Sequence, residues 1–516
     1  MRLTFRENAA VARSETCVSI FCGHAAEMLA RVFVRAPTAV RVARRGLASA
    51  TNAEIALLKE LLAKAQEREL AAARAAAAAA AAEAGGNRFQ IQTFDKISPS
   101  GLERFPATAF MLTGSSGKLP EGTEPEPHAI LLRSHTLAAE EVKPTVRAIA
   151  RCGAGTNNIP IEEMTKVGIP VFNTPGANAN SVKELVLAGL LLASRDIVGG
   201  ILHTKNKIVP EEKEHKKIEK RIEKDKSLFG GQELLGKTLG ICGLGNIGAM
   251  VAESALALGM KVVGYDPKLS VDAAWRLSSK VERCDSLEDV FSKSDYVSVN
   301  MPYIKGVTHG AISAAVLAKM KPTCHLLNFA RGEIVDGQAL LQLYENGHKG
   351  RYICDFADEG MQNHPKFMCI PHLGASTEEA EDNCAAMAAN QVINFLETGS
   401  IINSVNFPTA HLAPQKGHTR LCIVNQNIPG VLGAITTLMG QRGINIAQQL
   451  NTSRDKIAYN VLDLQDFPED ADKSAALQKE LASITGVLST RLIWTGSVSE
   501  GPSNFVSIAS QGAAQC

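Results

Sequence analysis

The sequence predicts an α/β protein with two doubly wound parallel-sheet domains and a smaller α+β domain at its C-terminal end. Three observations predict it. From about residue 87, short apolar runs such as FQIQTF, HAILLRS and IPVFNTP alternate with amphipathic stretches, as in βα units on a parallel sheet. Residues 241–266 read as a buried strand, a glycine-rich turn, an apolar helix and a second strand. Beyond residue 418 the order changes to strand, turn, helix, strand and strand, which indicates a separate small domain.

The first fifty residues have the composition of a targeting peptide. They contain eight arginines, no lysine and only the acids Glu7, Glu15 and Glu27. Residues 26–50 can form a basic amphipathic helix that runs into Arg44, Arg45 and small residues, which is typical of a mitochondrial presequence. We expect a mitochondrial rather than a plastid address, with an extension that has no address as the alternative. Residues 51–86 then read as an alanine-rich helical spacer.

Charge and cysteine usage exclude several classes of partner. The net charge is +1 and the sequence pI is about 7.6, so neither nucleic acid nor an anionic membrane is an expected partner. The longest apolar runs are too short to cross a bilayer. The 11 cysteines are scattered without a CxxC pair, which indicates reduced thiols and no metal site.

The glycine-rich turn has the spacing of a dinucleotide-binding motif. Gly243 permits a tight turn after a strand, Gly245 lets the backbone approach a pyrophosphate, and Gly248 lets the helix meet the strand. The N–H groups at the start of the helix favour phosphate. Asp266 ends the next strand, where a carboxylate accepts hydrogen bonds from a ribose and repels a 2′-phosphate. The pattern therefore predicts NAD rather than NADP.

Three polar side chains follow apolar runs downstream of this motif. Oxidation of an alcohol needs a base for the hydroxyl proton, an acid that orients and charges the base, and a cation for the substrate anion. His372, Glu359 and Arg331 fit these roles, and the carboxyl ends of parallel strands can bring them together. Taken singly, each has an ordinary alternative as an ion-pair residue or a loop side chain.

The segments GLGNIG, NFARGEIVD, DFADE and PHLGAST resemble the D-isomer-specific 2-hydroxyacid dehydrogenases, and the resemblance extends over about residues 89–494. It implies two Rossmann-like domains that clasp NAD and substrate, with Arg331, Glu359 and His372 as the catalytic set. Asp358 competes with Glu359 for the role of the acid. The expected cofactor-binding residues are Gly243, Gly245, Asn246, Ile247, Gly248, Asp266, Ala330, Arg331, Asp355, His372 and Gly374.

The resemblance further implies the reaction. We expect NAD-dependent oxidation of D-3-phosphoglycerate to 3-phosphohydroxypyruvate, the step that commits carbon to serine. The alternatives are another 2-hydroxyacid, such as glycerate or 2-hydroxyglutarate, and an NAD-sensing binding protein of the co-repressor kind. Arg133 and Arg151 would face the substrate phosphate, although both could instead extend from strand ends to water. The expected substrate residues are Arg133, Ser134, Arg151, Gly153, Asn178 and Arg331.

The C-terminal segment resembles an ACT domain, a module that binds small ligands where subunits pair. Asn427 and Asn445 match positions that hold an amino acid, and Asn425 stands where several relatives have histidine. The resemblance implies an L-serine effector and a homo-oligomer, either dimer or tetramer, with a purely structural pairing domain as the alternative. The expected boundaries are 87–185 completed by 375–408 for the substrate domain, 186–374 for the NAD domain, 409–418 for a linker, 419–495 for the ACT-like domain and 496–516 for a disordered tail.

Overall fold

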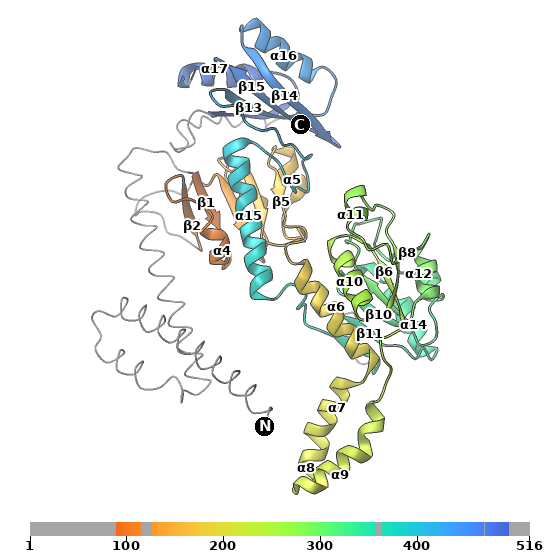
Figure 1. The fold of residues 1–516 in the computed structure, drawn as a ribbon. Coiled ribbons are helices and arrows are strands. Elements are labelled where there is room, and N and C mark those ends of the chain that lie inside the picture. Colours follow the sequence, from red (N-terminus) through yellow and green to blue (C-terminus); the bar gives the residue numbers. More distant parts are fainter. Residues whose placement is uncertain (1–88, 116–125, 357–363, 469, 495–516) are drawn as a thin grey trace, which may run out of the picture. The chain divides into compact units, whose positions relative to one another are not determined.

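A computed structural model describes residues 89–115, 126–356, 364–468 and 470–494, which form three sheets (Figure 1). The segments expected to hold the targeting peptide, the helical spacer and the C-terminal tail lie outside the described residues. Two sheets are parallel and the third is antiparallel, so the predicted fold class is confirmed.

The first sheet is parallel, five-stranded and ordered β2-β1-β3-β4-β5. From β1 the chain runs to β2 on one side and then crosses to β3 on the other side of β1. The point between β1 and β3 is therefore a topological switch point, where α/β proteins bind ligands. The strands are β1 (Phe89–Thr93), β2 (Phe110–Gly114), β3 (Ala129–Leu132), β4 (Ala148–Arg151) and β5 (Val171–Phe172). The helices of this part are α4 (Pro99–Leu102), α5 (Ile161–Lys166), α15 (Glu378–Thr398) and the 3-10 helix Ala139–Glu141.

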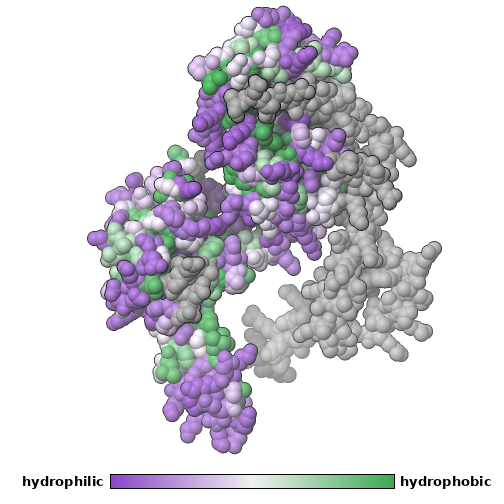
Figure 2. Space-filling model, turned by 180° about the vertical axis from the view of Figure 1, so that it is seen from behind, coloured by the Kyte–Doolittle hydropathy of each residue, from purple (hydrophilic) through white to green (hydrophobic). Residues whose placement is uncertain are grey.

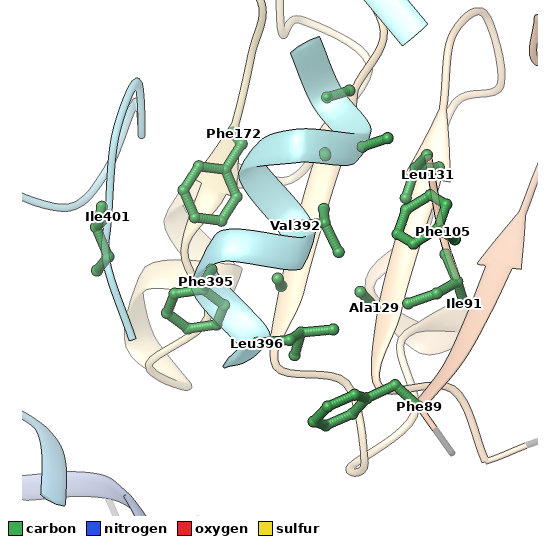
Figure 3. Close-up of a cluster of buried hydrophobic side chains, with 14 of the residues drawn as sticks. Phe89, Ile91, Phe105, Ala129, Leu131, Phe172, Val392, Phe395, Leu396 and Ile401 are labelled. Atoms are coloured by element: carbon green, nitrogen blue, oxygen red, sulfur yellow. The ribbon is translucent and has the colours of Figure 1, made fainter. Parts of the chain in front are cut away.

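Helix α15 covers one face of this sheet although it lies more than 200 residues beyond β5 in sequence. Its residues Val392, Phe395 and Leu396 pack with Leu131 and Phe172 of the strands (Figure 3). The Thr377 hydroxyl accepts from Ala380 N–H at its start, and Gly399 ends it with φ +73°. With 21 residues, α15 is about 31 Å long.

The second sheet is parallel, seven-stranded and ordered β12-β11-β10-β9-β6-β7-β8, the doubly wound order with its switch point between β6 and β9. Its strands are β6 (Thr238–Cys242), β7 (Lys261–Tyr265), β8 (Val281–Arg283), β9 (Tyr296–Val299), β10 (His325–Asn328), β11 (Tyr352–Cys354) and β12 (Phe367–Cys369). Its helices are α6 (Ala179–Ser194), α10 (Asn246–Ala257), α11 (Val271–Trp275), α12 (Leu287–Lys293), α13 (Ala314–Leu317), α14 (Gly337–Glu345) and the 3-10 helix Gly332–Ile334.

Between α6 and β6 the chain forms a helical arm, defined here as residues 195–230. It contains α7 (Ile197–His203), a π-helix (Thr204–Ile208), α8 (Val209–Glu211), α9 (His215–Asp225) and the 3-10 helix Lys226–Phe229. The extended backbone at Glu212 and Glu214 divides the charged stretch 205–226 into two helical parts. Its charged side chains form i,i+4 pairs, for example Arg221 with Asp225 at 2.7 Å.

The third sheet is antiparallel, with the order β14-β15-β13-β16 of a ferredoxin-like fold. Its strands are β13 (Thr419–Gln426), β14 (Asn445–Arg454), β15 (Ile457–Gln465) and β16 (Val487–Trp494), and its helices are α16 (Val431–Gln441) and α17 (Ala471–Ala482). One face packs on the two helices through Leu421 and Ile423, and the other joins the core around α15 through Cys422, Val424 and Tyr459. This α+β unit is consistent with an ACT-like domain.

The third sheet also binds the carboxyl end of α15 through polar side chains. Arg491 donates to the Phe395 carbonyl at 2.6 Å, Arg420 to the Thr398 carbonyl at 2.9 Å, and the Tyr459 hydroxyl to the Gly399 carbonyl at 2.7 Å. Arg420 is also paired with Asp463 at 2.6 and 2.8 Å, and both side chains are fully buried. The carbonyls of Thr398 and Gly399 lie at the end of the helix, where carbonyl groups lack an intrahelical partner, whereas the Phe395 carbonyl also accepts from Gly399 N–H at 2.9 Å.

In the described part of the chain, no single helix is long and apolar enough to cross a membrane. One bent pair of helices, 179–194 with 197–211, has the length and composition to do so.

Candidate active site

The glycine-rich turn lies at the switch point of the second sheet, between the ends of β6 and β9. Gly243 has φ +93°, and a Cβ there would lie 2.8 Å from the Met301 nitrogen that follows β9. A Cβ on Gly248 would overlap the Gly243 carbonyl oxygen. A Cβ on Gly245 would meet nothing within 4 Å. The turn therefore closes tightly on its protein side and leaves space at the start of α10, where a pyrophosphate fits.

Asn246 and Ile247 are the first residues of α10, so their backbone N–H groups belong to the positive end of this helix. Asp266 follows β7 as expected. Its carboxylate accepts from Leu244 N–H and from Lys268 N–H, each at 2.9 Å. It therefore ties the glycine-rich turn to the end of β7, which the sequence did not indicate, and keeps an acid beside the nucleotide-binding turn.

Arg331 follows β10, and the buried Asn328 fixes the loop that carries it. The Asn328 amide donates to the Arg331 carbonyl at 2.9 Å and accepts from Ala330 N–H at 3.1 Å. The Arg331 guanidinium lies 5.8 Å from the centre of the Phe356 ring. Ala330 adjoins it on the same loop.

His372 follows β12, at the same edge of the sheet. Its backbone has φ +52°, which is uncommon for a residue other than glycine, and its ring lies 4.8 Å from the Phe356 ring. The structure thus brings Arg331 and His372 close to the same aromatic ring. Sequence reasoning missed Phe356, and its position one residue after Asp355, just beyond β11, was the available signal.

Asp355 holds the loop that contains His372. Its carboxylate accepts from Leu373 N–H and Gly374 N–H, each at 2.8 Å, and the residue is almost fully buried. Burial raises the pKa of the Asp355 carboxyl, while these two N–H groups oppose the rise. Asp355 is among the expected cofactor-binding residues, and each of its carboxylate oxygens has one backbone partner. Glu359 and its competitor Asp358 lie outside the described residues.

The switch point of the first sheet is occupied by Asp95 and Arg133, which follow β1 and β3. The Asp95 carboxylate accepts from the N–H groups of Arg133, Ser134 and His135 at 2.9–3.0 Å. Burial alone would raise the pKa of Asp95, but these donors outweigh it and hold the pKa below its usual value. The expected substrate residues Arg133 and Ser134 therefore stand on a rigid turn. Asp95 was not foreseen from the sequence.

The Arg151 side chain is half-buried and bonds to the backbone of two loops. Its guanidinium donates to the carbonyls of Arg133 at 3.0 Å and Gly155 at 2.9 Å. A Cβ at Gly155 would lie 2.8 Å from the Arg331 guanidinium. Burial and the charge of Arg331 lower the pKa of Arg151. The turn that follows β4 is thus the place where the cations of Arg151 and Arg331 meet.

Three further substrate residues have defined surroundings. The Gly153 N–H donates to the Arg151 carbonyl at 2.8 Å, within its own turn. Asn178 precedes α6 without capping it through its side chain. Arg133 is paired with Glu381 of α15 at 2.6 Å, a partner that the sequence did not reveal.

The three asparagines of the third sheet are not gathered within one chain. Asn425 is buried, accepts from the Asn460 amide at 2.7 Å and donates to the Gln426 carbonyl at 2.6 Å. Asn427 donates to the Asp455 carbonyl at 3.2 Å, whereas Asn445 donates to Gln465 at the opposite end of β15. Asn425 pairs with Ala458 of β15, and Asn445 pairs with Gln465 of the same strand. The two asparagines are therefore about seven residues of strand, or about 23 Å, apart.

Comparison with known proteins agrees with this architecture. Residues 198–374 match the model of the D-isomer specific 2-hydroxyacid dehydrogenase NAD binding domain. A D-3-phosphoglycerate dehydrogenase of Haemophilus influenzae is 30% identical over 79% of this chain and 98% of its own, and one of Escherichia coli is 32% identical over 71% and 87%. The solved structure of a Rhodotorula graminis D-mandelate dehydrogenase has a TM-score of 0.51 at 20% identity, covering 64% of this chain and all of its own, which shows the shared fold.

The fold and the dinucleotide-binding turn therefore define an NAD-dependent dehydrogenase that acts on a CH–OH group. The chain belongs to the D-isomer specific 2-hydroxyacid dehydrogenase family, among the D-3-phosphoglycerate dehydrogenases.

Proposed function

We propose that this protein oxidises D-3-phosphoglycerate to 3-phosphohydroxypyruvate with NAD, at the first step of phosphorylated serine biosynthesis. The observation that carries the proposal is the gathering of the Arg151 and Arg331 cations at one turn, with Arg133 on the neighbouring strand. A substrate with a carboxylate and a phosphate needs fixed cations for both. The two curated relatives described above carry this activity in their names.

The substrate and cofactor sites are assigned to two domains. Residues 87–185 with 375–408 form the substrate domain, where Arg133, Ser134 and Arg151 face the phosphate and Asn178 lies nearby. Residues 186–374 hold NAD at Gly243, Gly245, Asn246, Ile247, Gly248 and Asp266, with Ala330, Asp355 and Gly374 on the nicotinamide side. The open space above Gly245 supports this placement.

In the proposed mechanism, Arg331 binds the substrate carboxylate in a bidentate manner and polarises the oxygen next to it. His372 accepts the hydroxyl proton at its ring and returns it in the reverse reaction. Glu359 stabilises the protonated ring, with Asp358 as the alternative acid. Bound NAD supplies the acceptor for the hydride. Asp355 positions His372, because its carboxylate accepts from the N–H groups of Leu373 and Gly374, which directly follow His372.

We further propose that the C-terminal domain binds L-serine between two subunits. Asn427 and Asn445 are about 20 Å or more apart along one sheet, so they form one site only if Asn445 comes from a second copy. Asn425 has its hydrogen bonds satisfied inside the sheet and would shape the site rather than bind the ligand.

The apolar surface of the helical arm supports the proposal that the protein is a homo-oligomer. Its exposed apolar side chains include Ile197, Ile201, Leu202, Val209 and Leu228, at 39–68% exposure. Figure 2 shows hydrophobic surface at the base of the arm and hydrophilic surface at its tip. A second copy of the chain that covers this apolar patch removes it from water and so stabilises the oligomer.

We also propose that residues 1–50 direct the protein to an organelle, with the mitochondrion favoured.

The test is NADH formation by the full chain, supplied with D-3-phosphoglycerate, D-glycerate or D-2-hydroxyglutarate, with and without L-serine. We expect turnover of D-3-phosphoglycerate, inhibition by serine, and a loss of at least about 100-fold in kcat/KM for Arg331→Ala. Turnover of only the unphosphorylated acids would contradict the proposed substrate. NADH binding without any turnover would favour a sensor. Light scattering during size-exclusion chromatography gives the subunit number, and a monomer would contradict the proposed oligomer.

A further inference from the structure

Arg133 and Glu381 form an ion pair at the edge of the first sheet, with 2.6 Å between the guanidinium nitrogen and the carboxylate oxygen. The two residues are about 250 positions apart, and Glu381 lies in the first turn of α15. The positive end of a helix stabilises acidic side chains in that turn. Cys384, one turn further along α15, is close enough to feel the charges of Arg133 and Arg151. This face of α15 therefore looks onto the two cations assigned to the substrate phosphate.

We propose that Glu381 sets the affinity of the substrate site for phosphate: its carboxylate is the resting counter-ion of Arg133, and an incoming dianionic phosphate must displace it. The inference rests on the proposed function, since it assigns the phosphate to Arg133.

The alternative role for Glu381 would be to position Arg133, and the backbone contacts argue against it. The turn that begins with Arg133 is fixed by three hydrogen bonds to Asp95. The Arg133 carbonyl also accepts from Arg151 at 3.0 Å and from the Asn158 amide at 3.2 Å. These five hydrogen bonds fix the backbone at Arg133, and none of them comes from α15.

The exposure of the pair indicates that it can be displaced. The Arg133 side chain is 27% exposed and that of Glu381 is 42% exposed, so water competes for both charges. A phosphate dianion can form two parallel charge-assisted bonds to a guanidinium and is the stronger partner. An unphosphorylated acid such as D-glycerate has no second anionic group and leaves the pair intact. Glu381 therefore lowers the affinity of the site for phosphate and leaves the affinity for unphosphorylated acids unchanged.

The experiment compares Glu381→Gln with Asp382→Asn as the matched control. Both variants remove one negative charge from the same turn of α15, but Asp382 hydrogen-bonds Ser98 rather than Arg133. We expect Glu381→Gln to lower the KM for D-3-phosphoglycerate about two- to five-fold at low salt and to lower the Ki of inorganic phosphate by a similar factor. The ratio of kcat/KM between D-3-phosphoglycerate and D-glycerate rises by a similar factor, because D-glycerate has no phosphate to displace Glu381 and its carboxylate is assigned to Arg331. High salt reduces these differences. Glu381→Asp retains the wild-type ratio.

A rise in KM for the phosphorylated substrate on Glu381→Gln, or equal effects of Glu381→Gln and Asp382→Asn, would overturn the inference. Calorimetric titration of the wild type and Glu381→Gln with inorganic phosphate separates this outcome from failure of the proposed function. A wild type that binds phosphate but does not oxidise D-3-phosphoglycerate contradicts the proposed function alone. Equal phosphate affinities of the two proteins contradict the role of Glu381 alone.

Discussion

Substitution of Gly248 by alanine tests the nucleotide-binding turn most directly. The new Cβ would overlap the Gly243 carbonyl oxygen and lie 3.3 Å from Ile241 Cγ2. Backbone on one side and a buried side chain on the other leave no soft neighbour that could yield. Helix α10 must therefore move away from β6, and overpacking of this kind costs about 1–3 kcal/mol of unfolding free energy. A displacement of about 1 Å at the start of α10 also reduces kcat/KM by up to about 100-fold.

Gly245→Ala provides the contrast. Its backbone has φ −68°, which alanine adopts easily, and its Cβ would meet no protein atom within 4 Å. We expect an unfolding free energy within about 0.5 kcal/mol of the wild type. NADH affinity should nevertheless fall about tenfold or more, because the methyl group enters the space that the pyrophosphate needs.

The assays are urea unfolding followed by far-ultraviolet circular dichroism and titration of NADH by its fluorescence. Gly440→Ala in α16, where a Cβ also has open space, controls for the general effect of replacing a helical glycine. Wild-type NADH affinity in Gly245→Ala would refute the placement of the cofactor over this turn. A wild-type unfolding midpoint in Gly248→Ala would refute the close contact.

Three further predictions concern buried polar groups. Asp355→Asn should reduce kcat/KM about 10- to 100-fold in the NADH assay, because the amide NH₂ faces a backbone donor of the His372 loop; a change below about threefold would contradict it. Asp463→Asn should lower the unfolding free energy by about 3–5 kcal/mol, since it leaves the Arg420 charge buried, and a loss under 1 kcal/mol in urea unfolding would contradict it. Burial lowers the pKa of His325 to about 4, so the native state excludes a proton that the unfolded state binds below about pH 6.5. Its contribution is therefore full above that pH and falls by up to about 3 kcal/mol toward pH 4, and His325→Gln should show a shallower loss in urea titrations over this range.

The parallel sheets were predictable because local periodicity carries the information. The runs FQIQTF and HAILLRS became β1 and β3, and GxGxxG supplied the turn after β6 with the expected positive φ at Gly243. Arg331 and His372 were found because each follows an apolar run, and strand ends share one edge of a parallel sheet.

The partners of these residues were not predictable, because they come from distant segments. No local pattern indicates that Asp95 would bind the turn at Arg133, or that Glu381 would pair with that arginine from another element. The separation of Asn427 from Asn445 likewise depends on the antiparallel register of β15, which sequence spacing does not reveal.

Side chains of the third sheet hydrogen-bond to the carboxyl end of α15, so a shortened form of the protein would lose these contacts. A chain that stopped near residue 408 would lose Arg420, Tyr459 and Arg491, and the last carbonyl groups of α15 would turn to water. The apolar side chains around α15 that pack on Cys422, Val424 and Tyr459 would also become exposed to water. We therefore expect a chain without residues 409–494 to unfold at a lower urea concentration than the full chain, because the end of α15 would lose both its polar and its apolar partners.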